Sequence, residues 1–257
     1  MRIVVKIGTS TLTHPSGCLN IRSTELLCKV LSDLKNKGNN IIIVSSGAIG
    51  MGVGKLSLRE KPADIPTKQA SAAVGQCELM YTYDKMFSEY NHTIAQILIT
   101  GDDFSHEDRH RNFANTMERL LDFGVLPIIN ENDSIATDEI KVGDNDTLSA
   151  LVAKSIKADL LVILSDIDGL YDKDPHKEAS ARLIDVVEEL TPDIMALGEG
   201  AGSALGTGGM KTKLDAAKIC TEAGCDMSIV NGQNPELLYD VIEGKRVGTR
   251  FCAKKPL

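Results

Sequence analysis

The stretch "IVVKIG", residues 3–8, decides the fold, because it is a short run of β-branched residues that ends in a glycine. A run that is apolar on both faces is typical of a central strand in a parallel sheet. Similar runs follow along the chain: "NIIIVSSG" (40–47), "TIAQILIT" (93–100), "VLPIINEN" (125–132), "DLLVILSD" (159–166) and "DMSIVNG" (226–232). We therefore predict buried parallel strands at these positions, with the first strand near the middle of the sheet.

Segments with helical spacing lie between these runs. Apolar or small residues recur every three or four positions in two of them: Leu26, Leu27, Val30, Leu31 and Leu34, and then Leu148, Leu151, Val152, Ser155 and Ile156. Strands that alternate with helices form right-handed βαβ units, which place helices on both faces of a mostly parallel sheet. The sequence has no internal repeat, low-complexity tract or Pro/Ser-rich linker. We expect a single α/β domain with two lobes.

The composition argues against several classes of protein. With 257 residues, 42% of them hydrophobic, the chain can bury its own core. A net charge of −8 argues against a broad nucleic-acid or anionic-membrane surface, because both partners need a large cationic face. The six cysteines lack zinc-ribbon spacing, and no apolar run approaches the ~20 residues of a membrane helix. We expect a cytoplasmic protein with reduced thiols that is neither exported nor anchored.

Glycine and polar residues gather where the predicted strands end. Ligands of open parallel sheets bind beyond these carboxyl ends. Four strands end in "KIGTS", "SSGAIG", "INENDS" and "SDIDG", while "GDNDTLSA" and "GTGGMKTK" open helices. Gly8, Gly47, Gly208 and Gly209 allow a phosphate to approach backbone N–H groups, although each alone also fits an ordinary βα turn. P-loop, Rossmann and protein-kinase signatures are absent, so a kinase built on this sheet would belong to another architecture.

Two lysines occupy positions that otherwise favour burial. Lys6 interrupts the first strand, and Lys213 shares a helix face with small and apolar residues. Lys211 falls on the opposite face, in a stripe with Asp215, Lys218 and Glu222, and we expect this stripe to be a solvated face with salt bridges. Lys6 either lies in water on an edge strand or contacts an anion, and Lys213 either extends to solvent or contacts an anion.

The segment "KVGDNDTLSA", residues 141–150, supplies a candidate counter-charge for these lysines. Alternatively, Asp144 or Asn145 caps the helix, and Asp146 complements the helix dipole in the first turn. That alternative explains one acidic residue well and the three adjacent polar residues poorly.

Six motifs, in this order and at these separations, resemble those of the glutamate 5-kinases within the amino acid kinase family: "VVKIGTS", "VSSGAIG", "INENDS", "EIKVGDNDTLSA", "SDIDGLYDKDP" and "GTGGMKTK". The resemblance extends from Lys6 to about Phe251. It implies an αβα sandwich with a mainly parallel sheet, in which about residues 1–155 bind the amino acid and about residues 156–257 bind the nucleotide. Many family members continue into a PUA domain, which we do not expect here because the chain stops near "RFCAKKPL".

The resemblance also implies roles for individual residues. Lys6 and Lys213 would contact the phosphoryl group during transfer, and Asp146 would orient both lysines. The residues that bind glutamate would be Ser46, Gly47, Asn130, Asp133 and Asn145. The residues that bind ATP would be Lys6, Gly8, Ser165, Asp166, Thr207, Gly208, Gly209, Met210, Lys211, Thr212 and Lys213. Mg²⁺ would be carried mainly by the ATP phosphates, and the chain would form a dimer or tetramer. The product would pass to a γ-glutamyl phosphate reductase on the way to proline.

Phosphoryl transfer to a carboxylate agrees with these residue types. Two unit negative charges 4 Å apart repel by roughly 4 kcal/mol at an effective dielectric of 20, so cations are needed between acceptor and donor. A carboxylate is already ionised at pH 7 and needs no general base. The five histidines lie outside the motifs: His14, His92, His106, His110 and His176. The ammonium group of glutamate suits "NEND", with Asp133 as its best single partner.

Two alternative functions stay open. A related phosphotransferase that acts on aspartate, N-acetylglutamate, carbamate or a nucleotide would share the fold, and "NEND" and "GDND" are what favour glutamate. A regulator or storage protein would still bind the nucleotide but would not catalyse phosphoryl transfer. The presence of both Lys6 and Lys213 argues against this alternative.

Two further segments are expected to be loops. "DIDGLYDKDP" does not follow the EF-hand order, and we expect it to lie near the nucleotide or to form a simple Asp-Gly turn. "SLREKPADIPTK", residues 57–68, contains two prolines and mixed charge, which favour a lid or a subunit contact.

Overall fold

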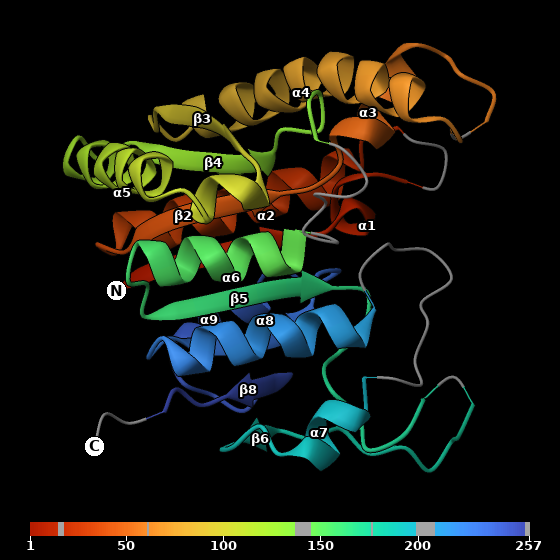
Figure 1. Ribbon diagram of the computed structural model, residues 1–257, viewed down its shortest axis with the longest axis vertical. Coiled ribbons are helices and arrows are strands. Elements are labelled where there is room, and N and C mark those ends of the chain that lie inside the picture. The colour runs from red at the N-terminus through yellow and green to blue at the C-terminus, as the bar shows by residue number, and fades with distance from the viewer. Residues whose placement is uncertain (15–17, 61, 137–144, 176, 199–208, 255–257) are drawn as a thin grey trace.

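The computed structural model describes residues 1–14, 18–60, 62–136, 145–175, 177–198 and 209–254 (Figure 1). Within these residues, the strands form one eight-stranded sheet in the order β3-β4-β2-β1-β5-β7-β8-β6. The strands are β1 (Arg2–Ile7), β2 (Asn40–Ser45), β3 (Ile94–Ile99), β4 (Leu126–Glu131), β5 (Leu160–Ser165), β6 (Val186–Val187), β7 (Asp226–Asn231) and β8 (Thr249–Phe251). The sheet therefore continues through both of the predicted lobes.

Helices cover both faces of this sheet (Figure 1). They are α1 (Thr9–Leu12), α2 (Ile21–Asn36), α3 (Ala48–Lys55), α4 (Ile65–Ser88), α5 (Glu107–Asp122), α6 (Asn145–Ser155), α7 (Pro192–Ala196), α8 (Met210–Glu222) and α9 (Leu237–Ile242), with a 3-10 turn η1 (Gly101–Phe104). Side chains of α5, α6 and α8 share one core with Val4 and Val44. Side chains of α2, α4 and α9 share a second core with Ile3 and Val5. The predicted αβα sandwich is confirmed.

β1 lies in the interior of the sheet, as its sequence predicts. It pairs in parallel with β2 on one side and β5 on the other, and Lys6 stands between Val44 and Ile163. The chain first extends the sheet through β2 and later returns to place β5 on the opposite side of β1. This reversal is a topological switch point, where the carboxyl ends of neighbouring strands form a crevice for ligands. An edge position for Lys6 is therefore wrong.

The periphery of the sheet differs from the sequence-based expectation. β3 is an edge strand that pairs only with β4 among the described strands, and its Gln96 and Leu98 side chains are exposed. The prediction of a buried strand at residues 93–100 is wrong, because β3 lacks a neighbour on one side. β8 runs antiparallel to β7, and β6 pairs with β8. These short strands complete a sheet that remains mainly parallel.

Part of the predicted loop at residues 57–68 is helical. α4 begins at Ile65, with Pro66 in its first turn, where a missing backbone N–H is tolerated. The Asp64 side chain caps this helix by accepting a hydrogen bond of 2.9 Å from the Thr67 backbone N–H. The prolines of this segment therefore mark a helix start as well as a loop.

α3 and α4 cross at two glycines that bring the helix backbones into contact. A Cβ atom at Gly52 would lie 1.8 Å from the Ser71 carbonyl oxygen. A Cβ atom at Gly75 would likewise lie 1.8 Å from the Ala48 carbonyl oxygen. Only glycine allows this approach, which fixes the start of α3 against the middle of α4.

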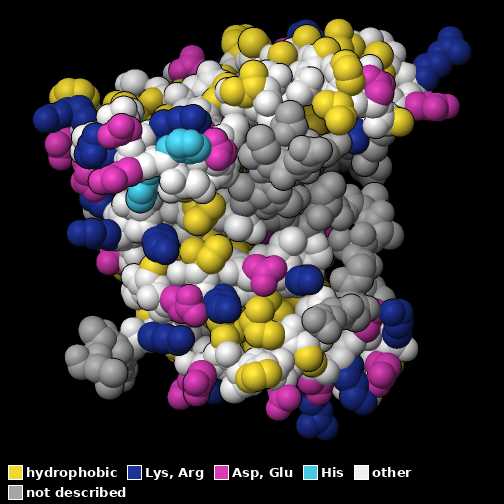
Figure 2. All heavy atoms as spheres, in the orientation of Figure 1, with side chains coloured by type: hydrophobic (Ala, Val, Ile, Leu, Met, Phe, Trp, Pro, Cys, Tyr) yellow, Lys and Arg dark blue, Asp and Glu magenta, His cyan; other side chains and the backbone are white. Residues whose placement is uncertain are grey.

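Charged side chains of both signs lie on the face of the molecule drawn in Figure 2. On the face drawn in Figure 2, lysines and arginines are interspersed with aspartates and glutamates. No helix in the described part of the chain is long and apolar enough to cross a membrane. All six cysteines belong to that part, and none of them forms a disulfide.

Candidate active site

One buried carboxylate joins the two lysines from distant parts of the chain. Asp146 Oδ1 lies 2.7 Å from Lys6 Nζ, and Asp146 Oδ2 lies 3.1 Å from Lys213 Nζ. The Asp146 side chain is fully buried, whereas Lys6 and Lys213 are 8% and 6% exposed as residues. Both lysines thus contact the candidate counter-charge from residues 141–150, whereas an anion held by the glycine turn before Lys213 stays a prediction. Extension of Lys213 to solvent and a purely dipolar role for Asp146 are wrong.

The electrostatics of this triad favour an anionic ligand. Burial tends to raise the pKa of Asp146, but the charges and hydrogen bonds of Lys6 and Lys213 lower it from 3.8 to about 2. The carboxyl group is therefore ionised at neutral pH. Within this triad alone, two ammonium groups and one carboxylate sum to a charge of +1, which suits an anionic ligand.

Three elements bring the triad together. Lys6 lies on the same face of β1 as Val4, because side chains two residues apart in a strand point to the same side. Asp146 is the second residue of α6, and Lys213 is the fourth residue of α8, which packs beside α6. Thr212 Oγ1 lies 3.1 Å from Asp146 Oδ2. The hydroxyl group of Thr212 is therefore the third group, after Lys6 and Lys213, that contacts the carboxylate.

The two lysines of α8 differ as helical geometry predicts. Lys213 is buried, and Lys211 is exposed on the other side of the helix. The predicted salt bridges of Lys211 are not present within 4.0 Å among the described residues, and Glu222 pairs instead with Lys254 at 3.9 Å. Met210, the first residue of the helix, is buried.

Glycines border the triad and its neighbouring helix starts. Gly209 is the N-cap of α8 and has no side chain to cap the helix, so the first backbone N–H groups of α8 suit a phosphate ligand. A Cβ atom at Gly8 would lie 3.9 Å from Lys6 Nζ, so glycine leaves space beside the ammonium group. Gly47 precedes α3 with φ of 106°, a left-handed conformation that favours glycine. Thr207 and Gly208 lie outside the described residues.

A second cluster joins three of the predicted acceptor-binding residues. Asn145 Nδ2 donates to Ser46 Oγ at 2.8 Å and to Asn130 Oδ1 at 3.0 Å. It also lies 3.0 Å from the Ser45 carbonyl oxygen. Asn145 immediately precedes Asp146, so α6 begins with one residue in each cluster. The ends of β2 and β4 and the start of α6 thus converge beside the lysine pair.

Gln76 belongs to this cluster, although the sequence analysis did not single it out. It lies on α4, is 8% exposed, and its Oε1 accepts a hydrogen bond of 2.9 Å from Asn130 Nδ2. It borders a cavity of about 10 Å³, together with Asp133 and Glu131 of the β4 end. This volume admits about one water molecule. Asp133 therefore lies beside the Asn130 cluster, as expected.

The predicted nucleotide-binding residues Ser165 and Asp166 lie at the carboxyl end of β5, as its last residue and the one after it. Ser165 is buried, and its Oγ donates to Asp166 Oδ1 at 3.2 Å. In the next turn, Asp168 accepts hydrogen bonds from Asn231 at 2.7 Å and from Tyr171 at 3.2 Å. The start of the "DIDGLYDKDP" loop is therefore fixed to the end of β7, at the same edge of the sheet as Ser165.

The described residues hold no cluster of three or more histidine, cysteine, aspartate or glutamate side chains suited to a metal ion. Asp146, the buried carboxylate of the triad, is engaged by Lys6 and Lys213 on both oxygens. These residues fit a phosphate chain that carries its own Mg²⁺ better than a metal held by the protein.

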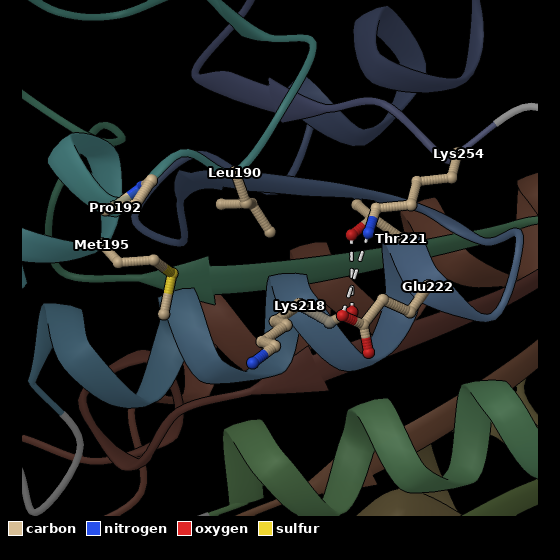
Figure 3. Close-up of a pocket in the computed structure, with 7 residues that line it drawn as sticks. All are labelled: Leu190, Pro192, Met195, Lys218, Thr221, Glu222 and Lys254. Atoms are coloured by element: carbon tan, nitrogen blue, oxygen red, sulfur yellow. Dashed lines mark hydrogen bonds and ion pairs between the residues drawn. The ribbon is translucent and has the colours of Figure 1, made fainter.

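A larger surface pocket, of about 220 Å³, lies away from these residues (Figure 3). It is lined by Leu190, Pro192, Met195, Lys218, Thr221, Glu222 and Lys254. The α8 residues among them belong to the second half of that helix, whereas Lys213 is in its first turn. This pocket is therefore separate from the lysine pair.

Comparison with known proteins agrees with this geometry. Residues 1–231 match the amino acid kinase family. Glutamate 5-kinase of Clostridium tetani is 59% identical over 98% of this chain and 95% of its own length. Glutamate 5-kinase of Caldanaerobacter subterraneus is 52% identical over 99% of this chain and 68% of its own length.

Solved structures with low sequence identity share the fold. Carbamate kinase from Giardia lamblia, bound to AMP-PNP, superposes with a TM-score of 0.70 at 16% identity, over 98% of both chains. UMP kinase from Ureaplasma parvum gives a TM-score of 0.66 at 18% identity, again over 98% of both chains. The chain belongs to the amino acid kinase family, and the predicted resemblance to the glutamate 5-kinases is confirmed.

Proposed function

We propose that this protein transfers the γ-phosphoryl group of ATP to the γ-carboxylate of L-glutamate, the first step of proline biosynthesis. A carboxylate oxygen forms a bond to the γ-phosphorus, the bond to the β,γ-bridging oxygen breaks, and ADP leaves. The product is γ-glutamyl phosphate. The observation that carries this proposal is the Asp146 carboxylate shared by Lys6 and Lys213, in a chain 59% identical to a glutamate 5-kinase.

Each group of the triad has a role in this reaction. Lys6 and Lys213 bind the oxygens of the phosphoryl group in flight and offset the repulsion between two anionic reactants. Asp146 holds both ammonium groups in position, since each of its oxygens contacts one of them. The uncapped start of α8 adds backbone N–H donors for the phosphates. Gly8 keeps the space beside Lys6 open.

The acceptor and the donor bind on opposite sides of the triad. Ser46, Gly47, Asn130, Asp133 and Asn145, all within about residues 1–155, bind glutamate. Ser165, Asp166 and residues 207–213, within about residues 156–257, bind ATP together with Lys6 and Gly8. Asp133 and its acidic neighbour Glu131 suit the ammonium group of glutamate. Mg²⁺ would arrive with the nucleotide phosphates and, when bound, would supply further neutralisation of their charge.

The wider setting is also part of the proposal. The protein acts in the cytoplasm, to which its unbridged cysteines are suited. It forms a dimer or tetramer, for which the open edge at β3 offers one contact surface. γ-Glutamyl phosphate is a reactive mixed anhydride, and a γ-glutamyl phosphate reductase consumes it.

One assay separates the candidate functions. The protein is incubated with Mg-ATP, hydroxylamine and one acceptor at a time, and acyl hydroxamate is measured. We expect hydroxamate with L-glutamate. Hydroxamate with aspartate or N-acetylglutamate only, or ADP release with carbamate or UMP only, would assign the chain to a related phosphotransferase. ATP binding without turnover for any acceptor would indicate a regulator.

A further inference from the structure

Gln76 is a buried amide beside the proposed acceptor site. Its Oε1 accepts from Asn130 Nδ2 at 2.9 Å, while its Nε2 is buried and donates to no described residue. Gln76 borders the cavity of about 10 Å³ at the end of β4. A buried amide is costly to keep unless its hydrogen bonds matter, so this side chain needs an explanation beyond packing.

Two backbone groups fix the orientation of two side-chain amides: that of Asn130, which bonds to Gln76, and that of Asn145, which bonds to Asn130. The Glu131 backbone N–H can only donate, and it donates to Asn130 Oδ1 at 2.9 Å. The Ser45 carbonyl oxygen can only accept, and it accepts from Asn145 Nδ2 at 3.0 Å. Asn130 must therefore turn its NH₂ group toward Gln76, and Gln76 must present its oxygen.

We infer that Gln76 is a positioning residue for the amino-acid acceptor, acting through Asn130 and Asn145. This inference rests on the proposed function, in which Asn145 binds glutamate. With its NH₂ group held by Ser46 and Asn130, Asn145 keeps its carbonyl oxygen for the acceptor. The carbonyl oxygen of Asn145 can accept a hydrogen bond from the ammonium group of an amino acid. If the Asn145 amide were turned around, its NH₂ group would face the ammonium group, and both groups would be donors.

The rest of the fold supports this role for Gln76. Gly75, the preceding residue, contacts the Ala48 backbone so closely that α4 cannot shift relative to α3. Asn130 is 2% exposed, so no solvent molecule can replace the Gln76 oxygen without rearrangement. The hydrogen-bonded amides of Gln76, Asn130 and Asn145 therefore connect α4, which is held against α3, to the start of α6, beside Asp146.

The test is Gln76→Met, which keeps the length of the side chain and removes both hydrogen-bonding groups. We expect KM for glutamate to rise about tenfold, with KM for ATP changed less than twofold. Thr82→Val is the matched control, because Thr82 is also buried on α4 and its hydroxyl bonds only within the helix, to the Glu78 carbonyl oxygen at 2.9 Å. This control should change neither KM. An unchanged glutamate KM in Gln76→Met overturns the inference.

A double-mutant cycle with Asn130→Ala separates positioning from direct contact. If Gln76 acts through Asn130, Gln76→Met adds less than a twofold change in glutamate KM to the Asn130→Ala variant. A persistent tenfold change would mean that Gln76 Nε2 contacts the acceptor itself, and would overturn the inference.

A second variant covers the case in which Gln76→Met does not fold. Gln76→Glu keeps an oxygen for Asn130 and should raise glutamate KM less than threefold, so a tenfold rise also counts against positioning. The wild-type protein distinguishes this failure from that of the proposed function. If the wild type forms no glutamate-dependent hydroxamate, both the proposed function and the role of Gln76 are wrong. If the wild type is active and Gln76→Met has an unchanged glutamate KM, only the role of Gln76 is wrong.

Discussion

The single carboxyl group of Asp146 contacts two buried lysines, and this unequal pairing sets the charge of the triad. A complete set of counter-charges would neutralise the site and weaken its attraction for phosphate. The Asp146 carboxylate instead holds both ammonium groups in place, and the triad by itself carries more positive than negative charge. Desolvation makes this arrangement costly for the free protein, as is usual where residues are arranged for catalysis.

The stability of the protein should depend on Asp146 at acidic pH. Its folded-state pKa lies at about 2, below the ordinary 3.8 that applies after unfolding. The depressed pKa stabilises the fold fully above pH 4, and this contribution is lost as the pH falls toward 2. Between pH 5 and pH 2.5 the loss should amount to roughly 1–2 kcal/mol. Urea unfolding at both pH values measures it.

Asp146→Asn is the comparison for this prediction, because other carboxylates also titrate in that range. The variant should be less stable at pH 5, by about 3–5 kcal/mol, since it leaves two ammonium groups buried without their counter-charge. Its own decline from pH 5 to pH 2.5 should be smaller than that of the wild type by roughly 1–2 kcal/mol. Equal declines in the two proteins would contradict the assigned pKa.

Individual residues of the site were predictable to different degrees. Helical phase alone placed Lys213 on the buried side of its helix, and the same test applied to α4 would have found Gln76. Its buried neighbours on that helix, Ala72, Leu79 and Tyr83, recur at the same three- and four-residue spacing. The direction of the amides could not be predicted, because it depends on two backbone groups from strands far apart in sequence.

At the scale of elements, α8 presents two lysines to different surroundings within one turn. Lys213→Ala should lower kcat by on the order of 10²–10³, because it removes a cation that acts on the transferred group. Lys211→Ala, on the exposed side, should change kcat less than threefold. Steady-state kinetics with saturating ATP and glutamate measure both effects.

These two variants control for each other, since each removes one lysine from the same helix. Lys213→Ala leaves Lys6 paired with Asp146, so the fold should persist, which circular dichroism can verify. Similar losses of kcat in both variants would show that the face of α8 does not decide the role of its lysines.

The interior strands were predictable from the sequence, and the periphery was not. β1, β2, β4, β5 and β7 are apolar runs in the positions expected of them. β3 has an equally apolar sequence, yet it lies at the edge, and nothing local to residues 93–100 distinguishes the two positions. β8, with three residues, exists as a strand only because β7 offers it a partner. Tertiary pairing decides both cases.

At the scale of the whole molecule, a net charge of −8 coexists with a cationic cleft. Attraction for a phosphate chain must therefore be local, and its binding should stabilise the fold. At a concentration of 100 times Kd, inorganic tripolyphosphate should add about 2.7 kcal/mol. This corresponds to a rise in melting temperature of about 5–10 °C for a chain of this size. Differential scanning calorimetry provides the measurement.

Sodium chloride at the same ionic strength is the control for general screening, and it should give a much smaller rise. Lys213→Ala should also reduce the effect of tripolyphosphate, because it removes one of the two ammonium groups. A rise of the same size with sodium chloride, or in Lys213→Ala, would argue against a localised phosphate site.

The shared carboxylate also has a consequence for the order in which the polypeptide is made. Synthesis from the N-terminus delivers Lys6 first and Asp146 much later, and these two form a neutral pair. Lys213 follows 67 residues after Asp146. A chain that stops between these two codons lacks Lys213 and also β7, the strand that pairs with β5. Assembly of the triad is therefore among the last contacts that synthesis makes possible.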